Sequence, residues 1–405
     1  MIRHLLQAIL IPGTLALAGP ADRYFEAQLR VVRGLEPRGE HFADLADESM
    51  RRLVAGGTLY LSGEPGMISE LFGRAGGLAG ARPLPLDKPL PELGGNDVVL
   101  VADYGTPGRL AATLSQLGSR PLIVVFASAE QPLLRQPPPH VRVVPVDFPL
   151  DSRLLRPAGG DPLLPVAPPA LATAQWTYVA ELIGAGRRQG RQLTVYLSTF
   201  IDAQRSRYER TRGVLFEPGM KPPAVPRGEY ARTFLQHARM SLEMVRAREL
   251  GAVRQAAAWI REAGGAGHQV IRSLVGHLPP LEAGLHGDAR LFARTQTLAG
   301  EKGIAWVREH VRAGDVLLFV AYRDDDAVAA AANAMGARTV ALTSVPAGLE
   351  QYRSPRHLHL NQYWPVNDAV LELPGYDVKA CPLSLIVTWS CYQAIVGEVV
   401  APGGG

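Results

Sequence analysis

Two short turns carry the residue types that bind a phosphate group. Each follows an apolar stretch typical of a buried strand: Ser62-Gly63-Glu64-Pro65-Gly66 and Tyr104-Gly105-Thr106-Pro107-Gly108. Backbone N–H groups at a helix start attract anions, hydroxyl side chains donate to phosphate oxygens, and glycine lets the backbone come close. The predicted ligand-binding residues here are Ser62, Gly63, Glu64, Gly66, Tyr104, Gly105 and Thr106. Glu64, however, would repel an anion. Alternatively, both segments are ordinary strand-to-helix turns with good N-caps.

Three side chains could act on a ligand as general acids or bases. Glu64 lies in the first of the two turns and Glu70 six residues later, and His277 lies in a turn of the second copy. An unperturbed imidazole titrates near neutral pH, which suits His277 to proton transfer. Simpler explanations remain open: Glu70 precedes Arg74 by four residues, the spacing of a helical ion pair, and His277 suits a capping or exposed loop histidine. Glu70 and His277 are the catalytic candidates.

The sequence predicts no cofactor and no metal. Neither glycine turn matches GxGxxG or the Walker pattern, so no nucleotide is indicated. The histidines His268, His286 and His310 are too widely spread for a metal site. Cys381 and Cys391 have no CxxC spacing and form no disulfide framework, so we expect two buried small hydrophobes on one C-terminal helix.

One stretch of the chain is repeated. Residues 97–126 align without gaps with residues 315–344, and eight positions are identical, among them Asp97/Asp315, Tyr104/Tyr322 and Gly118/Gly336. Each copy reads as an apolar strand, a polar turn, an Ala-rich helix closed by glycine, and a second strand. This is a βαβ unit, which requires a parallel sheet. The spacing of the copies predicts two domains, with ligand sites after the first strands.

The two copies differ at that turn. The second has Tyr322-Arg323-Asp324-Asp325-Asp326, whose carboxylates suit the start of a helix but would repel a phosphate. We therefore expect the second site to be degenerate for phosphate. Three consecutive carboxylates rarely aim at one ion, so a divalent metal there is not predicted either.

The composition is that of a globular protein. The 405 residues are 47% hydrophobic and 20% charged, enough for two or three cores. A net charge of +4 with scattered arginines gives no support for nucleic-acid binding, and we expect none. Residues 1–21 form an apolar segment. It fits either a secretory signal cleaved after Ala18 or a first helix packed on the domain, and it is too short to span a bilayer.

Both copies have the same order of elements. The first is expected to span 22–215 and the second 229–401, joined by a Pro-rich linker at 216–228. In the first copy we expect a helical stretch at 22–53, strands at 58–61 and 141–146, loop at 149–169, a helix at 171–187 and a strand at 193–200. In the second we expect a helical stretch at 230–263 and a strand at 270–275. Pro169 aligns with Pro382, and Trp176 with Trp389, at the final helix of each copy.

These motifs resemble those of a known family. The runs Gly57-x-Leu59-Tyr60-x-Ser62-Gly63 and Ser69-Glu70-Leu71-Phe72-x-Arg74-Ala75-Gly76-Gly77-Leu78 look like the opening of SIS (sugar isomerase) domains, closest to an uncharacterised bacterial branch. Asn367-Asp368-Ala369 and Pro382-x-Ser384 look like the end of the same pattern. The tandem organisation is similar to the isomerase half of glucosamine-6-phosphate synthase.

The resemblance implies two flavodoxin-like αβα sandwiches that bind phosphorylated sugars, and it adds Ser384 to the ligand-binding residues. It favours a sugar-phosphate (aldose–ketose) isomerase whose phosphate turns are eroded. The alternatives are a non-catalytic module that binds a sugar phosphate or an amino sugar, and a structural pseudoenzyme. A homodimer is implied, although the two copies could satisfy that pairing within one chain. A phosphorylated ligand predicts that the protein is cytoplasmic, whereas cleavage of residues 1–18 as a signal peptide would predict that it is exported.

Overall fold

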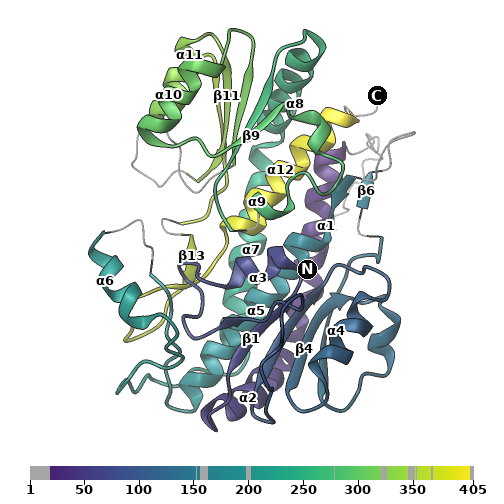
Figure 1. The fold of residues 1–405 in the computed structure, drawn as a ribbon, viewed down its shortest axis with the longest axis vertical. Coiled ribbons are helices and arrows are strands. Elements are labelled where there is room, and N and C mark those ends of the chain that lie inside the picture. Colours follow the sequence, from purple (N-terminus) through teal and green to yellow (C-terminus); the bar gives the residue numbers. More distant parts are fainter. Residues whose placement is uncertain are drawn as a thin grey trace, which may run out of the picture.

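The chain folds around two five-stranded parallel sheets (Figure 1). The computed structural model describes residues 19–151, 153–155, 163–197, 202–277, 279–320, 326–344, 352, 354–365 and 368–401. The apolar segment 1–18 and the turn 321–325 therefore lie outside the described residues.

The two sheets have the same strand order. The first comprises β1 (Leu59–Gly63), β2 (Arg82–Pro83), β3 (Val98–Asp103), β4 (Leu122–Ser128) and β5 (Val141–Val146) in the order β2-β1-β3-β4-β5. The second comprises β8 (Val270–Leu274), β9 (Arg294–Gln296), β10 (Val316–Val320), β11 (Arg338–Thr343) and β12 (His357–Asn361) in the order β9-β8-β10-β11-β12. This is the flavodoxin-like order, in which ligands bind at the carboxyl ends of the strands where the strand order reverses, between β1 and β3.

The repeated aspartate does the same work in both copies. Asp97 accepts the backbone N–H of Thr58 at 2.8 Å, and Asp315 accepts that of Gln269 at 2.9 Å. Each bond therefore ties the start of the central strand to the residue before its neighbour. The identity of these positions follows from sheet assembly and not from ligand binding.

Helices cover both faces of each sheet. The α-helices of the described residues, not all of which pack on a sheet, are α1 (Pro20–Leu35), α2 (Gly39–Val54), α3 (Pro65–Leu71), α4 (Arg109–Leu117), α5 (Ala167–Arg188), α6 (Asp202–Thr211), α7 (Glu229–Arg248), α8 (Leu250–Gly265), α9 (Pro279–Glu282), α10 (Gly300–His310), α11 (Asp326–Ala334) and α12 (Ser384–Val400). On the first sheet, α2 and α5 pack on one face and α4 on the other. On the second, α8 and α12 pack on one face, and α10 and α11 on the other. The predicted pair of αβα sandwiches is confirmed.

The two halves share one layer of helices. Helix α1 of the first half packs against α12 of the second, and α7 of the second half packs against α5 of the first. Figure 1 shows these long helices running through the middle of the molecule. Because α5 and α12 are covered on nearly all sides, their side chains are buried around the whole circumference, including Trp176 and Trp389. A single hydrophobic core thus runs from one sheet to the other.

Several sequence expectations need correction. The helical stretch 22–53 is two helices, because Pro37 cannot continue the helical ladder and a short 3-10 turn, Glu36–Arg38, separates α1 from α2. The stretch 230–263 also divides, at Glu249 between α7 and α8. Of the expected strand 193–200, the structure describes residues 193–197, and these join neither sheet: Leu193 and Val195 form only isolated bridges. Its apolar side chains are buried against loops, where backbone hydrogen bonds replace a sheet ladder.

The expected loop 149–169 contains a hairpin of β6 (Arg153–Leu155) and β7 (Leu163–Pro165). It corresponds to the hairpin of β13 (Ala369–Leu371) and β14 (Ala380–Pro382). In these hairpins Leu164 and Cys381 both have positive φ, at 62° and 60°. Pro382 therefore matches Pro165 and not Pro169, one helical turn away from the predicted alignment. Cys381 lies in β14 and not on the C-terminal helix with Cys391; both thiols are buried, as predicted.

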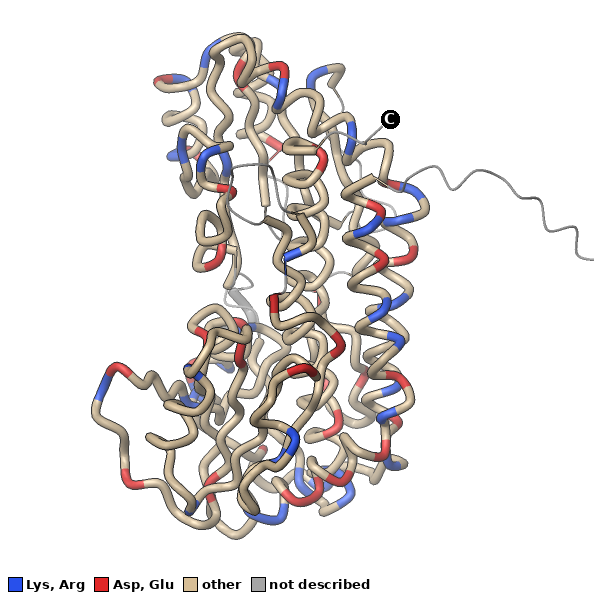
Figure 2. Tube along the Cα trace, turned by 90° about the vertical axis from the view of Figure 1, so that its right-hand side faces the viewer, with Lys and Arg blue, Asp and Glu red and all other residues tan. Residues whose placement is uncertain are grey.

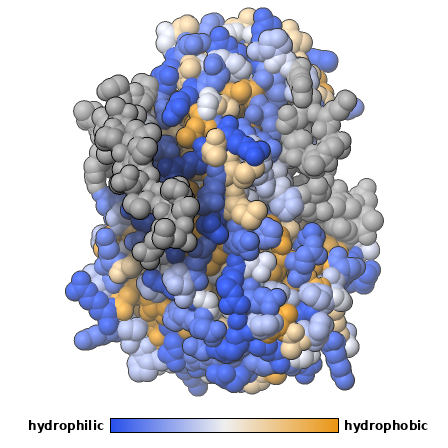
Figure 3. All heavy atoms as spheres, turned by 180° about the vertical axis from the view of Figure 1, so that it is seen from behind, coloured by the Kyte–Doolittle hydropathy of each residue, from blue (hydrophilic) through white to orange (hydrophobic). Residues whose placement is uncertain are grey.

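Opposite charges alternate along the long outer helices (Figure 2). Arg246 of α7 pairs with Asp22 of α1 at 2.8 Å, and Arg239 pairs with Glu36 at 2.8 Å. On the face opposite to Figure 1, hydrophilic residues predominate among those described (Figure 3). No helix within the described ranges is long and apolar enough to cross a membrane. In the same ranges, no group of three or more His, Cys, Asp and Glu side chains could hold a metal ion.

Candidate functional site

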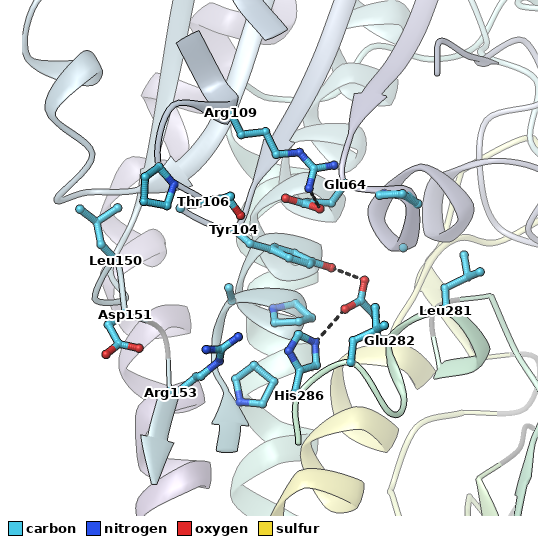
Figure 4. A pocket seen from close by; sticks show the side chains of 18 residues that line it. Glu64, Tyr104, Thr106, Arg109, Leu150, Asp151, Arg153, Leu281, Glu282 and His286 are labelled. Carbon is cyan, nitrogen blue, oxygen red and sulfur yellow. Dashed lines mark hydrogen bonds and ion pairs between the residues drawn. The ribbon is translucent and has the colours of Figure 1, made fainter. Parts of the chain in front are cut away.

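A pocket of about 450 Å³ opens where β1 and β3 end (Figure 4). The first half contributes the turn after β1, the turn after β3 and the β6–β7 hairpin, and the second half contributes α9 and the residues after it. The lining side chains are Glu64, Pro65, Gly66, Tyr104, Gly105, Thr106, Pro107, Arg109, Leu150, Asp151, Arg153, Pro165, Ala167, Pro168, Leu281, Glu282, Leu285 and His286. The pocket therefore occupies the position that this sheet order predicts for a ligand.

One wall of the pocket carries a buried carboxyl group. Glu64, which directly follows β1, is 5% exposed. Its Oε2 pairs with Nη1 of Arg109 at 2.8 Å, whereas its buried Oε1 has no partner among the described residues. Burial raises the pKa of Glu64 to about 7, against the opposing effect of Arg109. This carboxyl group is therefore poised to exchange a proton near neutral pH.

The opposite wall carries a chain of hydrogen bonds that joins the two halves. Tyr104 donates its hydroxyl to Oε1 of Glu282 at 2.8 Å. The other oxygen of Glu282 lies 3.0 Å from Nε2 of His286. A carboxylate accepts the proton of that nitrogen, so Nδ1 of His286 is left as an acceptor. This Nδ1 is buried and has no partner within the described part of the chain.

The turn residues predicted from sequence divide into two groups. Glu64, Gly66, Tyr104, Gly105 and Thr106 line the pocket. Ser62 and Gly63 do not. The Ser62 hydroxyl is buried and donates to the carbonyl of Leu84 at 3.0 Å. Gly63 has φ of 95°, and a Cβ there would lie 2.2 Å from the carbonyl oxygen of Ala102 on the neighbouring strand. The structure therefore gives Ser62 and Gly63 roles in building the sheet.

Glu70 and Ser384 lie in a separate, buried cluster that links the halves. Arg74 pairs with Glu70, as the i,i+4 spacing predicts, and binds Asp368 Oδ2 at 2.7 Å and Ser384 Oγ at 2.5 Å. Trp176 donates to Glu70 Oε1 at 3.0 Å. All five side chains are buried. The cluster brings the segment 69–78 together with Asp368 and Ser384, which lie far away in the sequence. None of its residues lines the pocket.

His277 lies beside this cluster and also outside the pocket lining. Its carbonyl accepts the Ser69 hydroxyl at 3.0 Å. Burial, together with the nearby Arg74, lowers the pKa of His277 to about 4. The imidazole is therefore neutral near pH 7, which does not suit it to donate a proton to a ligand.

A solved structure shares this architecture. The C-terminal domain of glucosamine-fructose-6-phosphate aminotransferase from Francisella tularensis matches with a TM-score of 0.51 and 11% identity over 94% of each chain. The chain has the tandem SIS fold. The structure of tagatose-6-phosphate ketose/aldose isomerase from Escherichia coli is also similar, with a TM-score of 0.41 and 11% identity over 94% of this chain and 91% of that one. No protein-family model and no curated protein matches the sequence.

Sequence reasoning missed the contribution of the second half of the SIS fold to the pocket. Glu282 and His286 are four residues apart after Pro279-Pro280, and that spacing was a visible signal for a helical pair. Nothing in the spacing, however, places them across from Tyr104. That placement depends on the helices shared between the two SIS halves, which bring α9 against α3.

Proposed function

We propose that this chain binds a phosphorylated sugar in the pocket beside β1 and β3 and catalyses aldose–ketose isomerisation there. One observation carries the proposal: Glu64 and His286 line the same pocket, and each has a buried polar atom without a partner among the described residues. Buried polar atoms are normally hydrogen-bonded, so a ligand is the natural partner of these two.

The reaction needs one proton to move between neighbouring carbons. A base removes the proton from the carbon next to the carbonyl group, and the conjugate acid returns it to the former carbonyl carbon. Glu64 suits this role because its pKa of about 7 allows it both to accept and to return the proton. His286, held by Glu282, would exchange the proton of the sugar hydroxyl through Nδ1.

The phosphate group would bind at the side of the pocket formed by Thr106 and Arg153. Thr106 offers an exposed hydroxyl two residues before Gly108, the N-cap of α4. Arg153 projects into the pocket from β6 (Figure 4), and its guanidinium has no ion-pair partner among the described residues. Arginine binds phosphate through several fixed donors. Arg109 is already paired with Glu64, so Arg153 is the better anchor.

The first test is a thermal-shift screen of hexose, hexosamine and heptose phosphates beside their unphosphorylated parents. A phosphosugar at 100 times its Kd should stabilise the chain by about 2.7 kcal/mol. Arg153→Ala and Thr106→Ala should reduce this shift, and Arg120→Ala, which removes an exposed arginine paired with Glu92, should not. Stabilisation without turnover would contradict the isomerase, and no stabilisation by any phosphosugar would contradict the binding proposal.

Gly66→Ala should abolish the ligand-induced shift and lower the melting temperature of the unliganded protein moderately, without unfolding it. A Cβ at position 66 would lie 2.2 Å from Oε1 of Glu282, the oxygen that accepts the Tyr104 hydroxyl. Glu282 is buried, so the added Cβ would push its side chain off both the Tyr104 hydroxyl and His286, which breaks the chain and costs about 1–3 kcal/mol for each group left unsatisfied. The measurement is the melting temperature with and without the best phosphosugar. A Gly66→Ala protein that responds like wild type would show that the Glu282 contacts are not needed for binding.

A further inference from the structure

The residues that bring His286 to the pocket are held by a buried aspartate. Asp288, 1% exposed, accepts the backbone N–H of Gly284 through Oδ1 at 2.8 Å and through Oδ2 at 3.0 Å. These bonds close residues 284–288 into a compact loop. His286 is at the middle of this loop, and Glu282 lies two residues before Gly284. The direction in which His286 points is therefore set by where Asp288 is fixed.

Asp288 is fixed to the interior of the second half. Its Oδ2 accepts Nη1 of Arg272 at 2.8 Å and also the hydroxyl of Tyr392. Arg272 lies on β8, within the second sheet, and it further donates to Thr295 on β9 at 2.8 Å. Its guanidinium lies 4.6 Å from the ring centre of Phe292. The Asp288 carboxylate is thus held by Arg272 of β8, which is itself bonded to β9, and by Tyr392 of α12.

Among the described residues, one further backbone bond holds the loop, from the N–H of Leu285 to the carbonyl of Glu282 at 3.1 Å. Leu285, the neighbour of His286, is 67% exposed, and Leu281 is 45% exposed. The His286 side chain is 11% exposed, and its Nε2 is hydrogen-bonded to Glu282 at 3.0 Å. Without Asp288, the loop would therefore keep few contacts that hold it in one conformation.

We infer that Asp288, fixed by Arg272 and Tyr392, is a positioning residue that aims His286 and Glu282 into the pocket of the first half. This inference rests on the proposed function for its effect on catalysis. The second SIS half then serves the first as a rigid support for these two side chains, through a carboxylate that contacts no ligand.

The test compares Asp288→Asn, Asp288→Ala and the control Asp377→Ala, which removes an exposed aspartate. The first readout needs no activity: the rate at which diethyl pyrocarbonate modifies His286, measured by mass spectrometry against the exposed His268. Both Asp288 variants should raise the His286 rate several-fold and leave the His268 rate unchanged, because the loop opens locally. Amide exchange at residues 284–286 should accelerate in parallel.

The second readout is turnover of the phosphosugar found in the screen. Misplacement of a reacting group by about 1 Å can cost about a hundredfold in rate, so kcat should fall by up to that factor while KM changes little. If Asp288→Ala does not fold, the Asn variant, which keeps an acceptor for Gly284, provides the comparison. Unchanged His286 reactivity and exchange in a folded Asp288 variant would overturn the inference. Failure of the proposed function would instead appear as absence of turnover in the wild type.

Discussion

Arg74→Ala should lower the free energy of unfolding by about 3–5 kcal/mol, the usual loss when one partner of a buried ion pair is removed. Arg74 is 2% exposed and compensates two buried carboxyl groups, Glu70 in the last turn of α3, which ends at Leu71, and Asp368 from the second half. Burial raises the pKa of both groups, and Arg74 opposes that effect. Without Arg74, two carboxyl groups would remain buried with no positive charge between them.

Denaturant unfolding at two pH values checks this prediction. Arg74 lowers the pKa of Glu70 and Asp368, so its removal raises both values further, and protonation then relieves part of the penalty. The loss caused by Arg74→Ala should accordingly be smaller at pH 6 than at pH 8. Arg120→Ala, which breaks an exposed pair with Glu92, should cost no more than about 1 kcal/mol. Arg74→Lys should fall between the two, and it keeps the comparison open if the alanine variant does not fold. An Arg74→Ala protein as stable as the Arg120→Ala control would show that the cluster does not hold the halves together.

Local signals in the sequence predicted the sheets well. The strand 141–146 has the expected bounds, and the repeat of residues 97–126 led directly to two parallel sheets of the same order. Period, turn glycines and strand length are local properties, so one sequence suffices to read them. The prediction of a strand at 193–200 was wrong for residues 193–197, because a local pattern cannot show what a segment packs against. Its apolar composition reports burial, but burial under loops and burial within a sheet select the same residue types.

Of the candidate site, the sequence predicted only residues that lie in the turns directly after β1 and β3. Glu64, Gly66, Tyr104 and Thr106 lie in the turns after two predicted strands, and they line the pocket. The role of Glu70 depended on long-range packing instead. Its pairing with Arg74 is visible at i,i+4, but Asp368 is 294 positions from Arg74 in the chain and meets it only in the fold. The same packing of the shared helices brings His286 to Tyr104 and leaves His277 outside.

Glu64→Gln should lower kcat for the phosphosugar by about 10²–10⁴-fold, the usual contribution of a general base. Glutamine keeps the shape of the side chain and can still contact Arg109, but it cannot take a proton. Binding should survive, so the thermal shift with the same ligand should stay within a few-fold of the wild-type affinity. Glu92→Gln, at an exposed position away from the pocket, is the matched control and should leave kcat unchanged.

The pH dependence separates a base from a residue that only shapes the pocket. A base must be ionised to act, so wild-type activity should rise with pH and reach half its maximum near pH 7, the pKa of Glu64. Arg109 lowers that pKa. Arg109→Ala should therefore move this rising part of the pH–activity profile, the acidic limb, to higher pH. Loss of a ligand contact alone would instead raise KM and leave the acidic limb in place. A limb that stays near pH 7 in Arg109→Ala, or persists in Glu64→Gln with substantial turnover, would assign the proton transfer to another group. A shift in the pH dependence of activity when Arg109, the first residue of α4, is replaced is thus the sharpest consequence of placing the buried Glu64 carboxyl beside this arginine.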